Sequence, residues 1–156
     1  MEGRRTLLLT VLLLLFGCIG CKRVGGTYQY FEMIEDRGWS SDKEVFFSSA
    51  ELKPNALYNV SLVLRLDRDI TYRTIPIGIT FETPNRELKT RVVQVPINRV
   101  KGDKSGYNIF EQKTVLEQGV QFPSQGVYSY SLRHLSTDSI IPGVVEVGLL
   151  IEPASR

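Results

Sequence analysis

Cysteine, histidine and tryptophan are scarce in this sequence. Its 156 residues include two cysteines, Cys18 and Cys21, one histidine, His134, and one tryptophan, Trp39. Because both cysteines lie near the N-terminus, the rest of the chain holds no disulfide and lacks the Cys and His sets that bind zinc. Nucleophilic catalysis with an imidazole base would depend on His134 alone. We therefore expect no metal site, no cofactor, no catalytic residue and no enzyme activity.

An excess of charge of one sign is also lacking. Nineteen Lys and Arg residues are balanced by 17 Asp and Glu residues, which leaves a formal net charge of +2. Nucleic-acid-binding domains carry a clustered basic surface, so we expect no nucleic-acid partner. Hydrophobic residues make up 42% of the chain, a composition typical of a globular domain.

No apolar run is long enough to span a bilayer, which takes about 20 residues. The run at residues 6–16 follows Arg4 and Arg5 and stops at Gly17. A basic start, a short apolar segment and a small residue at its end are typical of a secretory signal peptide. We interpret residues 1–17 as a signal peptide that is cleaved between Gly17 and Cys18.

The segment Leu15-Phe16-Gly17-Cys18 is similar to the bacterial lipobox. It predicts that the Cys18 sulfur carries diacylglycerol, with acyl chains such as palmitate. We expect no bound cofactor apart from this covalent lipid. Cys21, which follows Gly20, is the alternative lipidation site. Two or three acyl chains are enough for stable membrane anchoring. Residues 18–27 then form the lipidated N-terminus and a short tether.

Alternation of apolar and polar residues begins at Tyr28, and it is the pattern of half-buried strands. The clearest runs are 58–66, 75–81, 128–132 and 145–151, and weaker ones are 27–34, 43–48, 88–98 and 107–121. Turn-forming segments separate these runs. About eight such strands favour an all-β fold, an antiparallel β-sandwich over residues 28–153. Pro76 and Pro96 interrupt two runs, which predicts edge strands or bulges there.

Polar candidates for a site are few. His134 lies at a strand end, where we expect a solvated or structural role. Asp67-Arg68-Asp69 lacks the spacing of a calcium loop, and we expect it at the tip of a hairpin. Glu35-Asp36 has no identifiable partner carboxylate of the kind that glycoside hydrolysis requires.

Aromatic residues are the other candidates. Tyr30, Tyr128 and Tyr130 are expected to fill the core of the sandwich. Trp39 lies in a turn-like segment, and two roles are open for it: it caps the core, or it contacts a partner protein from the surface.

The order of motifs along the chain is more specific than any one of them. After the lipobox the motifs are Tyr28, Phe31, Gly38-Trp39, Asp42, Val45-Phe46-Phe47, Leu57-Tyr58-Asn59-Val60, Val63, Arg65, Phe122-Pro123, Gly126-Val127-Tyr128, Asp138-Ser139-Ile140, Pro142-Gly143-Val144 and Val147-Gly148-Leu149-Leu150-Ile151-Glu152. This order resembles the gliding-motility lipoproteins of the GldH type, from Bacteroidetes-like bacteria, over most of residues 28–152.

The resemblance implies a non-enzymatic envelope lipoprotein associated with gliding motility and type IX secretion. Its expected partners are the membrane, through the lipid, and other envelope proteins, with no small-molecule substrate. Acidic residues are absent directly after Cys18, which favours the periplasm-facing side of the outer membrane over the cell surface. The alternative function is a carbohydrate-binding or glycan-processing β-sandwich lipoprotein.

Overall fold

The structure, a computed structural model, describes residues 27–98 and 109–154. The predicted signal peptide, its cleavage site between Gly17 and Cys18, the alternative Cys21 and the tether as far as residue 26 lie outside the described residues. These assignments stay predictions.

Ten strands and a single-turn 3₁₀ helix, η1, make up the described part of the chain. In chain order they are β1 (Tyr28–Met33), η1 (Glu35–Arg37), β2 (Gly38–Ser40), β3 (Val45–Ser48), β4 (Leu57–Asp67), β5 (Thr74–Glu82), β6 (Leu88–Pro96), β7 (Ile109–Gln121), β8 (Ser129–His134), β9 (Ile140–Pro142) and β10 (Val144–Pro153). All eight predicted strands are present, with ends within two residues of the expected ones. β2 and β9 were not predicted, because three-residue strands are too short to display an alternation.

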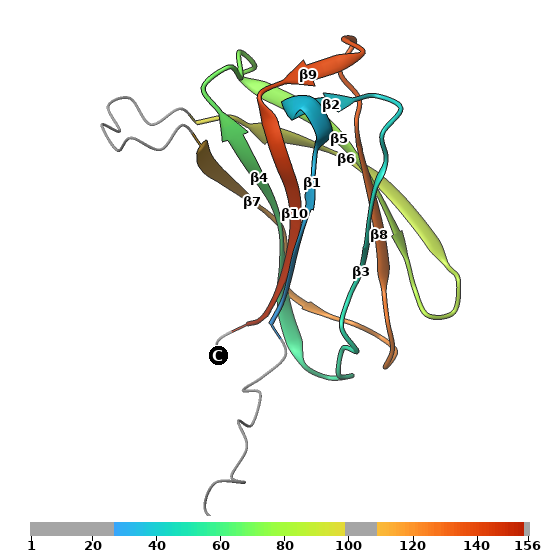
Figure 1. Cartoon of the computed structure of the whole chain (residues 1–156). Helices are drawn as coiled ribbons and strands as arrows, with labels where there is room; N and C mark the ends of the chain where they lie inside the picture. Colours follow the sequence, from blue (N-terminus) through green and yellow to red (C-terminus); the bar gives the residue numbers. More distant parts are fainter. Residues whose placement is uncertain (1–26, 99–108, 155–156) are drawn as a thin grey trace, which may run out of the picture.

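The strands form two antiparallel sheets that pack face to face (Figure 1). The first sheet has the order β1-β10-β4-β7 and the second has the order β3-β8-β5-β6. β2 and β9 pair separately as a two-stranded ribbon. The prediction of an all-β antiparallel sandwich is confirmed.

The inward faces of both sheets form one core. Leu62 and Leu64 of β4 are fully buried in the first sheet, and Ile75 and Ile77 of β5 are fully buried in the second. Each such side chain contributes about 1.5–3 kcal/mol to folding by leaving water. The alternation seen in the sequence is therefore the alternation between core and outer face.

Two of the three tyrosines expected in the core are there. Tyr128 and Tyr130 are buried, and the Tyr128 ring stacks on Phe81 at a centroid distance of 5.4 Å. The prediction for Tyr30 is wrong, since its side chain is 52% exposed. Tyr30 lies on the edge strand β1, where its ring packs edge to face on the ring of Phe47 of the edge strand β3.

Pro96 lies on an edge strand, β6, as predicted, but Pro76 does not. β5 lies between β8 and β6, so Pro76 is on a central strand. The pairing of β5 with β8 ends at Ile77 and His134, and the Pro76 carbonyl accepts a hydrogen bond from the Leu135 N–H just beyond it, at 2.8 Å. Proline is tolerated there because the missing N–H falls at the end of the ladder.

The two ends of the sandwich have different compositions (Figure 1). At the end that we call the near end, β1 begins and β10 ends, and Tyr28 pairs with Ile151. The opposite, far end carries η1, the β2–β9 ribbon and the connection from β4 to β5. Any tether that precedes Tyr28 therefore joins the domain at the near end.

Gly143 connects three elements at the far end. Its N–H donates to the Arg37 carbonyl and its carbonyl accepts from the Asp67 N–H, each at 2.8 Å. Its φ is 84°, and a Cβ on it would lie 2.4 Å from the Ile70 nitrogen. Glycine is needed here for both reasons, the left-handed backbone and the close approach of the chain.

The prediction of a hairpin tip at Asp67-Arg68-Asp69 is wrong, because β4 and β5 belong to different sheets. The segment instead crosses between the sheets at the far end. Asp67 is 3% exposed, its Oδ1 accepts a hydrogen bond from the Asp69 N–H at 2.8 Å, and its Oδ2 lies 3.7 Å from Arg37 Nη1. This carboxylate holds the crossing in place.

Candidate functional site

Trp39 and His134 lie together inside the far end. Trp39 is 0% exposed and His134 is 2% exposed, and their rings meet edge to face at a centroid distance of 5.5 Å. Trp39 Nε1 donates a hydrogen bond to the Lys43 carbonyl at 2.9 Å. Trp39 thus caps the core, one of its two predicted roles. The other, a partner contact at Trp39, is wrong because the ring has no exposed surface.

His134 is buried, so of the two roles predicted for it, solvated or structural, the structural one is correct. Burial lowers its pKa, and the nearby Trp39 backbone and Asp138 carboxylate only partly offset this. Neither imidazole nitrogen has a hydrogen-bond partner within the described residues. The imidazole is therefore neutral at physiological pH and closed to substrates in solvent.

The other acidic candidates do not converge on a site. Glu35 and Asp36 are exposed in η1, whereas Asp67 is buried in the crossing. In residues 27–98 and 109–154, no group of three or more His, Cys, Asp and Glu side chains is arranged to hold a metal ion. Over the same ranges, no helix is long and apolar enough to cross a membrane.

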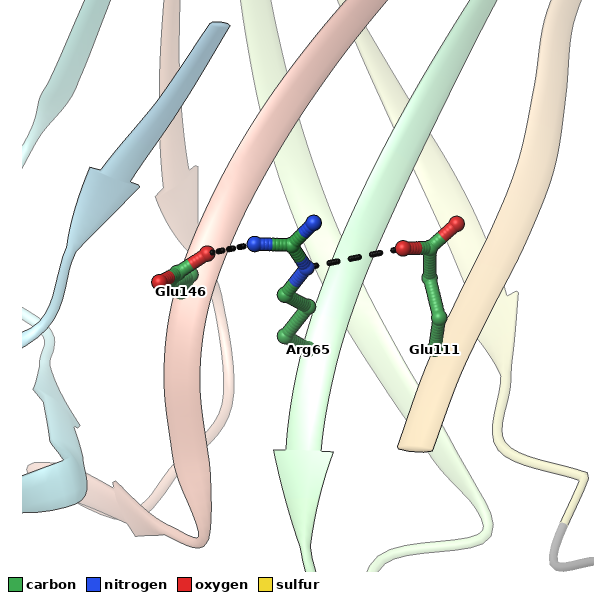
Figure 2. Close-up of polar contacts among 3 residues, drawn as sticks. All are labelled: Arg65, Glu111 and Glu146. Carbon is green, nitrogen blue, oxygen red and sulfur yellow. Dashed lines mark hydrogen bonds and ion pairs between the residues drawn. The ribbon is translucent and has the colours of Figure 1, made fainter. Parts of the chain in front are cut away.

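A charged cluster lies across the first sheet (Figure 2). Arg65 of β4 donates from Nη1 to Glu146 of β10 at 2.6 Å and from Nε to Glu111 of β7 at 3.5 Å. Its guanidinium carbon lies 3.9 Å from the centroid of the Phe31 ring on β1. The hydrogen bond to Glu146 raises the pKa of Arg65. The cluster links all four strands of the sheet, and we interpret it as a brace.

The two flanks of the sandwich are closed differently. On one flank the edge strands β1 and β3 are bridged by the rings of Tyr30 and Phe47. On the other flank the edge strands β6 and β7 are bridged by an ion pair between Arg91 and Glu117. Arg91 also donates from Nη2 to the Leu116 carbonyl at 3.3 Å. This second flank is open enough to hold a pocket.

The pocket lies between β6 and β7 and has a volume of about 290 Å³. Its floor is apolar and largely aromatic, formed by Ile79, Phe81, Val120, Phe122 and Tyr130. The rings of Phe81 and Tyr130 are 5.0 Å apart at their centroids, so the floor is a packed part of the core. We call this cavity the flank pocket.

The rim of the flank pocket is polar. Lys89, Arg91 and Glu117 contribute charged groups, and Gln121 contributes an amide. Burial raises the pKa of Tyr130, so its hydroxyl stays protonated at physiological pH. Apolar walls with a few convergent polar groups are typical of a binding pocket.

The sequence analysis did not identify the flank pocket, although β6 carries a signal for it. Its inward positions pair with Ile75, Ile77, Ile79 and Phe81, and they are Val95, Val93, Arg91 and Lys89. The change from valine to arginine and lysine on a core-facing row marks the place where the core opens. Only the opposed strand, which is distant in sequence, shows that this row faces inward.

The family model described as GldH lipoprotein matches residues 26–151, which include nearly the whole sandwich. A search of curated proteins finds no significant match. Among solved structures, the VP2 subviral particle of infectious bursal disease virus aligns at a TM-score of 0.38 and 12% identity, over 88% of this chain. The alignment spans 34% of the viral chain, and at this level of likeness it carries no functional information. The family match covers most of the sequence, and the chain therefore belongs to the GldH lipoprotein family, a family of membrane-anchored envelope proteins.

Proposed function

We propose that this protein is a non-enzymatic assembly module, a lipid-tethered β-sandwich that docks onto other envelope proteins of the gliding and type IX secretion machinery. The observation that carries the proposal is the family match, which extends over residues 26–151 and so includes nearly the whole sandwich. The proposed anchor is the lipid on Cys18, or on Cys21 as the alternative.

The position of the tether supports this function. Tyr28, where β1 begins, follows Cys18 by ten residues. An extended chain of that length reaches at most about 35 Å. The tether would thus keep the near end within about 35 Å of the membrane, and the flanks and the far end can be presented to partners. We place the protein on the periplasm-facing side of the outer membrane.

The burial of His134 supports the absence of catalysis. Its imidazole packs edge to face on Trp39 and is 2% exposed. An acid–base mechanism needs the group within hydrogen-bond reach of a substrate. We therefore expect a chain with His134→Phe, which keeps the ring contact, to retain envelope function.

The test is replacement of the chromosomal copy in a gliding host by Cys18→Ala, Cys21→Ser or His134→Phe. We expect Cys18→Ala to lose membrane association together with surface spreading and protein secretion. The other two variants should behave as the wild type. If His134→Phe were folded, membrane-bound and inactive, the non-enzymatic function would be wrong.

The side of the membrane is tested separately with intact cells. A periplasm-facing protein resists added protease until the outer membrane is permeabilised, whereas a surface protein is cleaved at once. Binding of the purified protein to envelope polysaccharide, with loss of binding on mutation of exposed aromatic residues, would instead favour the glycan-binding alternative.

A further inference from the structure

We propose that the free edge of β6 and the flank pocket together bind an extended, acidic segment of a partner protein, which adds a strand to the second sheet and inserts one large apolar side chain into the pocket. This inference rests on the proposed assembly function, and it names the docking surface and the kind of partner segment.

The edge of β6 is suited to strand addition. Its nine residues pair with β5 without any register shift. β7, the other edge on this flank, carries two irregularities, around Tyr58/Val60 and Val60/Ser61 in its pairing with β4. Bulges twist an edge away from further pairing. Among residues 27–98 and 109–154 no strand pairs with the outer edge of β6, so this regular edge remains a template for another strand.

The backbone groups at this free edge can be assigned. The Pro76 carbonyl points toward β8, where it accepts from the Leu135 N–H. In an antiparallel strand the N–H and the carbonyl of one residue point the same way. Gln94, which is opposite Pro76, therefore directs both groups away from β5. By alternation Val92, Thr90 and Leu88 do the same, so the edge offers main-chain donors and acceptors at every second residue.

Side chains on both faces of β6 complement such a segment. On the outer face Leu88 is 66% exposed and Val92 is 58% exposed, and each would pack against an outward side chain of the added strand. On the inner face the flank pocket lies beside Lys89 and Arg91. Its volume of about 290 Å³ accommodates a single aromatic or long aliphatic side chain.

Charge selects the partner. β6 contains Lys89 and Arg91 and no acidic residue. Arg91 pairs with Glu117, whereas Lys89 makes no ion pair within the described residues. An acidic residue next to the inserted side chain would complement Lys89. Pairing with β6 of a second copy would instead bring two lysines without ion-pair partners, Lys89 of each copy, onto one short edge and would supply no acidic residue from β6, so we assign the site to a different protein.

The experiment uses the full-length lipidated protein in its own cells. A photo-crosslinking phenylalanine derivative replaces Val92 at the free edge, and in a matched strain it replaces Phe46, which is 67% exposed on the edge strand β3 of the other flank. We expect a discrete protein adduct from position 92 and none from position 46. Mass spectrometry should map it to a segment that carries an acidic residue beside an aromatic or long aliphatic one.

Two variants test the contribution of the pocket. Val120→Phe fills it, and we expect the adduct from position 92 to fall roughly tenfold, as for loss of an interface anchor. Lys89→Glu changes only the exposed rim of the pocket, and it should lower the yield of the adduct from position 92 severalfold. Because this variant leaves the core unchanged, it tests the pocket even if Val120→Phe lowers stability. An adduct insensitive to both variants would overturn the pocket assignment.

The remaining outcomes separate this proposal from the assembly function. Protein adducts from position 46 but not from position 92 would overturn the β6 site and leave the assembly function in place. The absence of protein adducts from both positions would overturn the β6 site, and the assembly function would then be judged by the secretion and spreading of the Cys18→Ala strain. An adduct at position 92 to a second copy, a lipid or a polysaccharide would overturn the site as proposed here.

Discussion

Trp39 and His134 show how a motif residue can be essential without being a surface site. Trp39 is fully buried, donates to the Lys43 carbonyl and packs against the imidazole of His134. A tryptophan in a turn-like, polar stretch of sequence is ambiguous between core and surface. Two of the neighbours that bury it, His134 of β8 and Ile141 of β9, come about 100 residues later. Their contribution is visible only in three dimensions.

Loss of the Trp39 ring should be costly. We expect Trp39→Ala to lower the free energy of unfolding by about 3–5 kcal/mol, because it leaves a large cavity under the far end. Trp39→Phe keeps an aromatic ring but loses the N–H, and it should cost roughly 1–3 kcal/mol. Urea unfolding of the two variants beside the wild type measures this. An unchanged unfolding midpoint for Trp39→Ala would contradict the buried position.

His134 should make stability depend on pH. Burial lowers its folded-state pKa below the unfolded value of about 6.5. Below that pH the unfolded chain binds a proton that the folded chain does not, so the stability contributed by the neutral imidazole is lost as the pH falls. His134→Phe removes this term.

The measurement is urea unfolding of both proteins at pH 7.5 and pH 5.5. The stability of the wild type relative to His134→Phe should fall by up to about 1.4 kcal/mol between these pH values. Groups common to both proteins cancel in this difference. An equal difference at the two pH values would mean that His134 titrates in the folded protein as it does in water.

The strands show which elements could be predicted and which could not. β4, β5, β8 and β10 are central strands, and their alternation predicts them directly. β2 and β9 are three residues each, and they exist because the far end closes around Gly143. The crossing at Asp67 was mistaken for a hairpin tip because turn residues do not reveal which sheet the next strand joins.

Gly143 offers a test of this closure. Gly143→Ala places a Cβ 2.4 Å from the Ile70 nitrogen in addition to forcing a φ of 84°. We expect it to destabilise the fold by well over 3 kcal/mol or to prevent folding. Gly119 is the matched control, since its φ is also positive, at 61°, but a Cβ there meets no atom within 4 Å.

Gly119→Ala should therefore cost only the backbone term, about 1–2 kcal/mol. Thermal unfolding of the two variants separates close approach from backbone conformation. Similar melting temperatures for both would show that the connection at Gly143 yields easily, and that the far end is held by other contacts.

The place where β1 begins gives the sandwich an expected orientation relative to the membrane, because β1 starts at the near end (Figure 1). β4 has 11 residues and spans about 36 Å. With lipid on Cys18, the far end should lie that much farther from the membrane than the near end. The flank pocket, lined by Lys89, Val120 and Gln121, lies in the half toward the near end.

This orientation can be measured in proteoliposomes. On a Cys21→Ser background, a fluorophore attached through Gln125→Cys reports from the near end and one attached through Ser139→Cys reports from the far end. Energy transfer to a labelled lipid should be clearly stronger from position 125. Equal or reversed transfer would show that the tether does not hold the sandwich upright.

Local sequence was sufficient for the eight main strands, because half-buried strands are specified by neighbouring residues. The leader and the lipidation motif were also read from local sequence, and they stay predictions. The match to residues 26–151 agrees with the family that the order of motifs indicated. The burial of Trp39 and His134, the exposure of Tyr30, the crossing at Asp67 and the flank pocket depended on tertiary structure. Each of them is set by which strand lies at an edge and which strand of the opposite sheet faces it. Those pairings join residues tens of positions apart, and no local pattern encodes them.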